Sequence, residues 1–186
     1  RRAVQDTRCL VAGDLSPTGL LTEPLGDTRF DELVAIYKEQ VDALAEAGVD
    51  LIVCETMTGL TDARAALLAA RTAGKPVFVT MTVDGQGRTM SGSPLLPCLI
   101  TLQALGAAGV GLNCSTGLTG MDEWIGAVLP HAAVPLIAKP NAMMKDAVGF
   151  DQNLDPDSFA QGTQILMDAG ASIVGGCCGT TPAHLA

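Results

Sequence analysis

The chain of 186 residues carries 11 Lys and Arg against 20 Asp and Glu, which gives a formal net charge of −9 at pH 7. This acidic balance argues against nucleic acid as a partner, because phosphate binding needs clustered basic residues. No apolar run is long enough for a membrane span, and no apolar signal core opens the chain. With 48% hydrophobic residues, we expect a single soluble, cytoplasmic domain over residues 1–186.

Short apolar segments alternate with longer amphipathic ones along the chain. The predicted strands are Cys9–Ala12, Asp50–Cys54, Pro76–Thr82, Val110–Asn113, Pro135–Lys139 and Ser172–Gly175. Each is nearly continuous in apolar residues, as in parallel strands that are buried on both faces. Asp31–Ala47 predicts a helix with one apolar stripe. This helix is predicted to end at Ala47-Gly48. Further helices are predicted to end at Ala73-Gly74, Ala108-Gly109 and Ala169-Gly170, and one to begin at Asp155-Pro156.

The repeat of strand and helix predicts an α/β fold built from about six βα units. Such a repeat fits either an open doubly wound sheet or part of a (β/α)8 barrel, which usually needs about 250 residues. Composition does not choose between them. No G-x-G-x-x-G fingerprint follows a strand, and no phosphate-binding G-x-x-x-x-G-K-[ST] motif occurs.

The most informative segment runs from Gly175 to Pro182, with the sequence GGCCGTTP. Neighbouring side chains on a regular strand point to opposite faces, so Cys177 and Cys178 can converge only where the backbone leaves strand geometry. Gly176 and Gly179 permit that departure. The pair is interpreted as a metal or thiol site, with a vicinal disulfide or small residues packed under a tight turn as alternatives.

Cys114 strengthens the metal interpretation, because it also follows a predicted strand. The carboxyl ends of parallel strands meet at one edge of the sheet, so three thiols are expected there. Three thiolates suit zinc and leave a fourth position open for a substrate. Cys9 and Cys54 lie within predicted strands and Cys98 within a helical stretch, so these three are assigned to the core.

Other polar residues are predicted at the same edge of the sheet. Glu55 follows the second strand directly, and Lys139-Pro140-Asn141 ends the fifth. Asp14 and Asp84 are ordinary turn residues, and the loop from Asp84 to Thr89 is a connection that could close over a site. His131 and His184 are expected at the surface. Without a well-placed histidine, a Ser-His-Asp or Cys-His hydrolase is disfavoured.

Together these motifs resemble the zinc-dependent homocysteine S-methyltransferase family across the whole chain. The motifs are GLNC at residues 111–114, GGCCGTTP at residues 175–182, Glu55-Thr56-Met57 and Lys139-Pro140-Asn141. The resemblance implies a (β/α)8 TIM-type barrel with zinc held by Cys114, Cys177 and Cys178. It also implies that Glu55 holds the amino group of homocysteine and that Asn113 supports the site beside the zinc.

The activity implied by the resemblance is methyl transfer to the zinc-bound thiolate of homocysteine, which forms methionine. The donor stays open among betaine, S-methylmethionine and methyl-cobalamin supplied by methyltetrahydrofolate, with cobalamin and folate bound by other domains or proteins. The family's first strand with its Asp-Gly pair and its second βα unit are not recognised here. The sequence is therefore interpreted as a barrel domain truncated at both ends. A zinc-binding or thiol redox module without methyl transfer is the alternative. A third hypothesis is a βα scaffold whose cysteines only pack in the protein.

Overall fold

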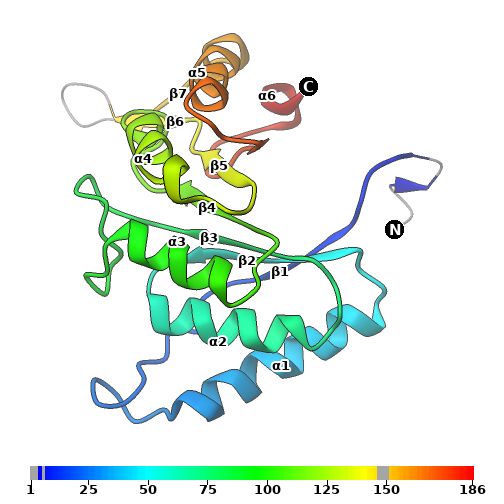
Figure 1. The fold of residues 1–186 in the computed structure, drawn as a ribbon. Coiled ribbons are helices and arrows are strands. Elements are labelled where there is room, and N and C mark those ends of the chain that lie inside the picture. Colours follow the sequence, from blue (N-terminus) through cyan, green and yellow to red (C-terminus); the bar gives the residue numbers. More distant parts are fainter. Residues whose placement is uncertain (1–3, 6, 146–150) are drawn as a thin grey trace.

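A computed structural model describes residues 4–5, 7–145 and 151–186 and shows strands alternating with helices (Figure 1). The strands are β1 (Ala12–Leu15), β2 (Leu51–Met57), β3 (Val77–Met81), β4 (Gly109–Cys114), β5 (Leu136–Pro140), β6 (Met143–Lys145), β7 (Asp151–Asn153) and β8 (Ile173–Val174). The helices are α1 (Phe30–Glu46), α2 (Leu60–Arg71), α3 (Leu95–Ala104), α4 (Met121–Val128), α5 (Pro156–Asp168) and α6 (Pro182–Leu185), with a 3-10 turn, η2 (Leu129–His131).

Six strands form one parallel sheet in the order β1-β2-β3-β4-β5-β8. The α/β class and the repeated βα unit predicted from sequence are thereby confirmed. β6 and β7 form a separate antiparallel pair between β5 and α5. Because all strands of the main sheet run the same way, their carboxyl ends and the loops that follow them lie along one edge.

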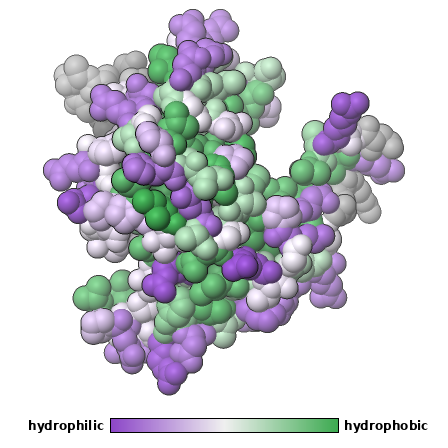
Figure 2. Space-filling model, in the orientation of Figure 1, coloured by the Kyte–Doolittle hydropathy of each residue, from purple (hydrophilic) through white to green (hydrophobic). Residues whose placement is uncertain are grey.

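One face of the sheet is packed against helices and holds the apolar core. Cys54, Val79 and Leu112 on this face are fully buried, and Cys98 of α3 is buried as well. The core assignment of Cys54 and Cys98 is therefore confirmed. On the molecular face drawn in Figure 2, apolar residues gather through the middle and hydrophilic residues lie toward the outside. No helix in the described part of the chain is long and apolar enough to cross a membrane.

The opposite face of the sheet is concave, and two glycines of β4 permit its curvature. A Cβ atom at Gly111 would lie 1.9 Å from the carbonyl oxygen of Ile137 in β5. A Cβ atom at Gly109 would contact the side chains of Phe78 and Ile137, at 3.1 and 3.2 Å. Because β4 carries no side chain at these two positions, residues from the strands on either side of it meet over the concave face.

Two boundaries predicted from sequence are wrong. The first strand is Ala12–Leu15 rather than Cys9–Ala12, and Cys9 is exposed instead of lying in the core. Asp14 was assigned to a turn, but it lies within β1, where it is paired in register with Val53 of β2. The third helix ends at Ala104, where Gly106 adopts a φ of +93°, and Gly109 belongs to β4 rather than to the helix end.

Candidate metal centre

The three cysteines singled out in the sequence lie together at the carboxyl edge of the sheet. The Sγ atom of Cys114 is 2.8 Å from that of Cys177 and 3.6 Å from that of Cys178, and the latter two are 3.9 Å apart. Four ligands around a tetrahedral zinc at about 2.3 Å would hold their sulfurs about 3.8 Å apart. Two of the three separations match this value, and the third reaches it if Cys114 and Cys177 separate by about 1 Å. The donor set therefore fits zinc.

Local backbone geometry makes the two neighbouring cysteines converge. β8 ends at Val174, so both cysteines lie beyond regular strand structure, and Gly179 has a φ of +79°. The N–H of Cys177 donates to the carbonyl of Pro140 at 2.9 Å, and the N–H of Cys178 donates to Oδ1 of Asn141 at 3.1 Å. The end of β5 thus fixes the position of the cysteine pair.

Asn113 is completely buried and connects the sulfur cluster to β2. Its Oδ1 accepts from the N–H of Thr56 at 3.0 Å, and its Nδ2 donates to Oγ1 of Thr56 at 2.7 Å. Nδ2 also lies 3.6 Å from Sγ of Cys177. Asn113 therefore lies beside a sulfur of the cluster, and its support of a bound zinc stays a prediction. Thr56 is the residue of this network that sequence reasoning did not weigh as a contact.

The surroundings of Cys114 and Cys177 shift the pKa values of the two thiols in opposite directions. Burial, followed by the neighbouring sulfurs of Cys177 and Cys178, raises the pKa of Cys114. At Cys177 burial also favours the neutral thiol, but the contacts with Cys114 and Asn113 and the N–H of Cys178 outweigh it and lower its pKa. Of Cys114 and Cys177, the sulfur of Cys177, beside Asn113, therefore takes up negative charge more readily.

Charged side chains occupy the concave face next to the cluster. Nζ of Lys139 on β5 donates to Oε2 of Glu55 on β2 at 2.5 Å. Burial, followed by the charge of Glu55, raises the pKa of Asp14 on β1. Sequence reasoning placed Glu55 and Lys139 at one edge of the sheet but did not foresee the ion pair, and it undervalued Asp14.

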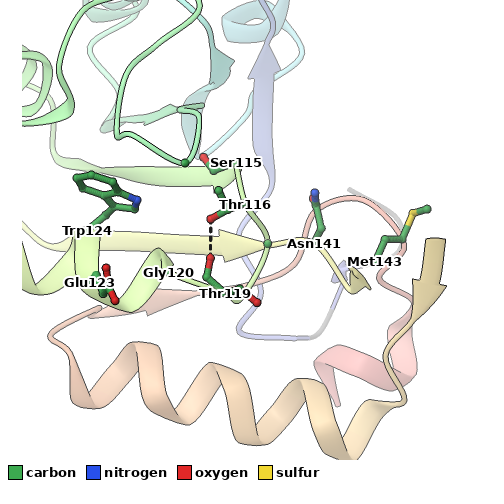
Figure 3. A pocket seen from close by; sticks show the side chains of 10 residues that line it. Ser115, Thr116, Thr119, Gly120, Glu123, Trp124, Asn141 and Met143 are labelled. Atoms are coloured by element: carbon green, nitrogen blue, oxygen red, sulfur yellow. Dashed lines mark hydrogen bonds between the residues drawn. The ribbon is translucent and has the colours of Figure 1, made fainter. Parts of the chain in front are cut away.

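A pocket of about 710 Å³ lies beside the cysteines. Figure 3 shows Trp124 and Glu123 of α4 on one side of the pocket, with Asn141 and Met143 on the other. Asn141 also accepts from the N–H of Cys178, so the pocket adjoins the sulfur cluster. The loop from Asp84 to Thr89 packs here as well, because a Cβ atom at Gly87 would lie 2.5 Å from the ring of Trp124.

His184 has a structural role that the surface assignment missed. Its Nδ1 accepts from the N–H of Thr181 at 3.1 Å, and its Nε2 lies 2.9 Å from the carbonyl oxygen of Leu154. Its ring also packs edge-on against Phe159, with ring centroids 5.5 Å apart. The spacing of Thr181 and His184 is that of a capping box, with histidine in place of the usual Glu or Gln, and was the available signal. His131 is exposed at the end of η2, as expected.

Comparison with known proteins gives consistent results. A sequence profile of the homocysteine S-methyltransferase family matches residues 1–186. The methionine synthases of Mycobacterium tuberculosis (strain ATCC 25618 / H37Rv) and Mycobacterium leprae (strain TN) are 35% and 34% identical to this chain over 189 residues. The alignments cover 97% of this chain but only 16% of each synthase.

Among solved structures, the metallated homocysteine methyltransferase MmuM from Escherichia coli matches with a TM-score of 0.74 at 25% identity, over 95% of this chain and 59% of that one. The apo form matches with a TM-score of 0.76 at 24% identity. The fold match bears out the predicted barrel-type α/β architecture, of which this chain supplies six strands. The profile match over the whole chain shows that it belongs to the homocysteine S-methyltransferase family.

Proposed function

We propose that Cys114, Cys177 and Cys178 hold one zinc ion and that the site transfers a methyl group to the thiol of homocysteine. The observation that carries this proposal is the meeting of three sulfurs from two separate chain segments within 4.8 Å of one another. Zinc bound there would keep the acceptor thiol deprotonated at neutral pH, and the thiolate is the nucleophilic form of sulfur. Three protein ligands leave one position for that thiol.

Other residues of the chain would position the cysteines and bind the substrate. Asn113 holds Cys177 in place through its contacts with Thr56 and the sulfur. Glu55 would accept hydrogen bonds from the amino group of homocysteine. In the reaction a bond forms between the acceptor sulfur and the methyl carbon, while the bond from that carbon to the donor breaks. The electron pair of the broken bond stays on the donor, and the thiol proton leaves for solvent before the attack.

The pocket next to the cysteines offers space through which a methyl donor reaches the sulfur. Betaine, S-methylmethionine and methyl-cobalamin supplied by methyltetrahydrofolate are the candidate donors. Cobalamin and folate would be bound by other domains or proteins, since this chain spans only 16% of the methionine synthases it matches.

A thiol redox module that cycles a disulfide between Cys177 and Cys178 is the competing function. The geometry favours it less, because the Sγ atoms of this pair are 3.9 Å apart, whereas those of Cys114 and Cys177 are 2.8 Å apart. A vicinal redox pair also has no need of Cys114.

Metal analysis of the full-length protein tests the proposal. We expect about one zinc per chain, lost in Cys114→Ala and in Cys177→Ser with the circular dichroism spectrum unchanged. Cys9→Ala is the matched control, because Cys9 is a free, exposed thiol outside the site. Methionine formation from homocysteine, measured with each donor, should follow zinc content. Zinc retained in Cys114→Ala, or a metal-free protein with Cys177 and Cys178 joined, would contradict the proposal.

A further inference from the structure

The ion pair between Glu55 and Lys139 spans the concave face of the sheet. β2 and β5 are separated by β3 and β4, so the two side chains meet only because the sheet curves. Lys139 is paired in register with Asn113, the residue beside the sulfur of Cys177. A Cβ atom at Gly175 would lie 3.4 Å from Cγ of Lys139, so the lysine stem runs along the segment that leads to Cys177.

This ion pair leaves hydrogen-bonding capacity unused on both partners. A lysine ammonium has three donors, and Oε2 of Glu55 is the one acceptor that the described residues offer to Nζ of Lys139. Within the same part of the chain, Oε1 of Glu55 accepts no hydrogen bond. The two side chains keep 24% and 22% of their surface exposed, so a ligand can reach the free donors and the free oxygen.

An α-amino acid carries an ammonium and a carboxylate on one carbon, and the free groups of the ion pair complement both. We propose that Lys139 binds the α-carboxylate of the amino-acid acceptor while Glu55 holds its ammonium group. The proposal rests on the function proposed above and names Lys139 as the residue that selects an amino-acid thiol over a simple aminothiol.

The charge pattern of the sheet supports this assignment. Lys139 is the only Lys or Arg within the six strands of the sheet, and it lies beside two carboxylates, Glu55 and Asp14. Two negative groups and one positive group match the ammonium and carboxylate of a zwitterion. Because Lys139 is in register with Asn113, which contacts the sulfur of Cys177, the thiol of an amino acid held there would lie on the same side of the sheet as the cysteines.

Lys139 also admits an opposing role, in which its ammonium occupies the place of the substrate ammonium and competes for Glu55. The two roles predict opposite effects of removing the charge. If Lys139 binds the carboxylate, its loss weakens the binding of homocysteine only. If Lys139 competes, its loss strengthens the binding of every thiol that carries an ammonium.

Calorimetric titration of the zinc-loaded, full-length protein distinguishes these roles. The two ligands are homocysteine and 3-aminopropane-1-thiol, which is homocysteine without its carboxylate. In Lys139→Met we expect homocysteine affinity to fall about 10- to 100-fold, because one charge-assisted hydrogen bond is lost, with less than about threefold change for the aminothiol. Lys139→Arg keeps the charge and should recover part of the affinity. Lys38→Met removes an exposed lysine–carboxylate pair on α1 and is the matched control.

The outcomes separate this inference from the proposed function. A zinc-loaded, active protein whose preference for homocysteine survives Lys139→Met, or whose variant binds both thiols more tightly, overturns the role of Lys139 alone. A protein without zinc and without methyl transfer that still selects homocysteine through Lys139 overturns the proposed function alone. A protein that binds neither thiol overturns both.

Discussion

Gly111 of β4 offers the sharpest test of how the sequence shapes the site. An alanine Cβ there would lie 1.9 Å from the carbonyl oxygen of Ile137, and the contacted atom is backbone that no rotamer change can move. β4 and β5 would have to separate by more than 1 Å along a register of five paired residues. Overpacking usually costs about 1–3 kcal/mol, so we expect Gly111→Ala to lose about 3 kcal/mol.

Thermal unfolding followed by circular dichroism measures this loss. For a chain of this size, about 3 kcal/mol corresponds to a fall in Tm of about 6–12 °C. Gly126→Ala is the matched control, because Gly126 lies in α4 with nothing within 4 Å of its Cβ position. Alanine is the better helix former, so that variant should gain about 0.5–1 kcal/mol. A Gly111→Ala variant that melts within about 2 °C of the parent would refute the close approach of the two strands.

Three further changes probe the site and its supports. Asn113→Asp places a carboxylate beside the sulfur of Cys177, and this negative charge raises the pKa of the thiol and disfavours the thiolate that binds zinc. We therefore expect zinc affinity to fall at least about tenfold in a chelator competition assay. Burial raises the pKa of Asp62, so the folded protein loses stability when the pH rises above that raised pKa, and loses none below the pKa of the unfolded chain. In urea unfolding, the free energy of unfolding of Asp62→Asn relative to the parent should therefore be more favourable at pH 7 than at pH 4. Gly87→Ala should shift the fluorescence of Trp124, the chain's only tryptophan, because the new Cβ would lie 2.5 Å from the ring.

Much of the architecture could be read from the sequence because local signals agreed with one another. Continuous apolar runs located the starts of five strands of the main sheet to within one residue, whereas the first strand, Ala12–Leu15, begins three residues later than predicted. The glycines after Ala47, Ala73 and Ala169 marked the ends of helices. The signal failed at Ala108-Gly109, where Gly106, three residues earlier, takes the left-handed conformation. Two glycines only three residues apart give the same signal in a sequence, and only the backbone conformation shows which of them ends the helix.

The site was predictable as a set of residues but not as a set of contacts. The three cysteines lie at or after strand ends, and parallel topology alone brings such residues to one edge. Their role as metal ligands, and the roles of Glu55 and Asn113 toward substrate, stay predictions. The ion pair of Glu55 with Lys139 could not be foreseen, because it depends on sheet curvature that glycines of another strand allow.

Strained backbone conformations are concentrated near the sulfur cluster. In the described part of the chain, the residues other than glycine with positive φ are Thr56, Cys114 and Ser115, at 59°, 52° and 53°. Such conformations cost about 1 kcal/mol or more each, and for a β-branched threonine they are especially rare. Asn113 binds the N–H and the hydroxyl of Thr56, and Oγ of Ser115 donates to the carbonyl of Asn113 at 3.0 Å. All three strained residues are therefore at or beside the sulfur cluster. The buried amide of Asn113 thus holds the strained backbone and also contacts the sulfur of a candidate ligand. For this reason, a change that destabilises β4 should also alter the geometry of the site.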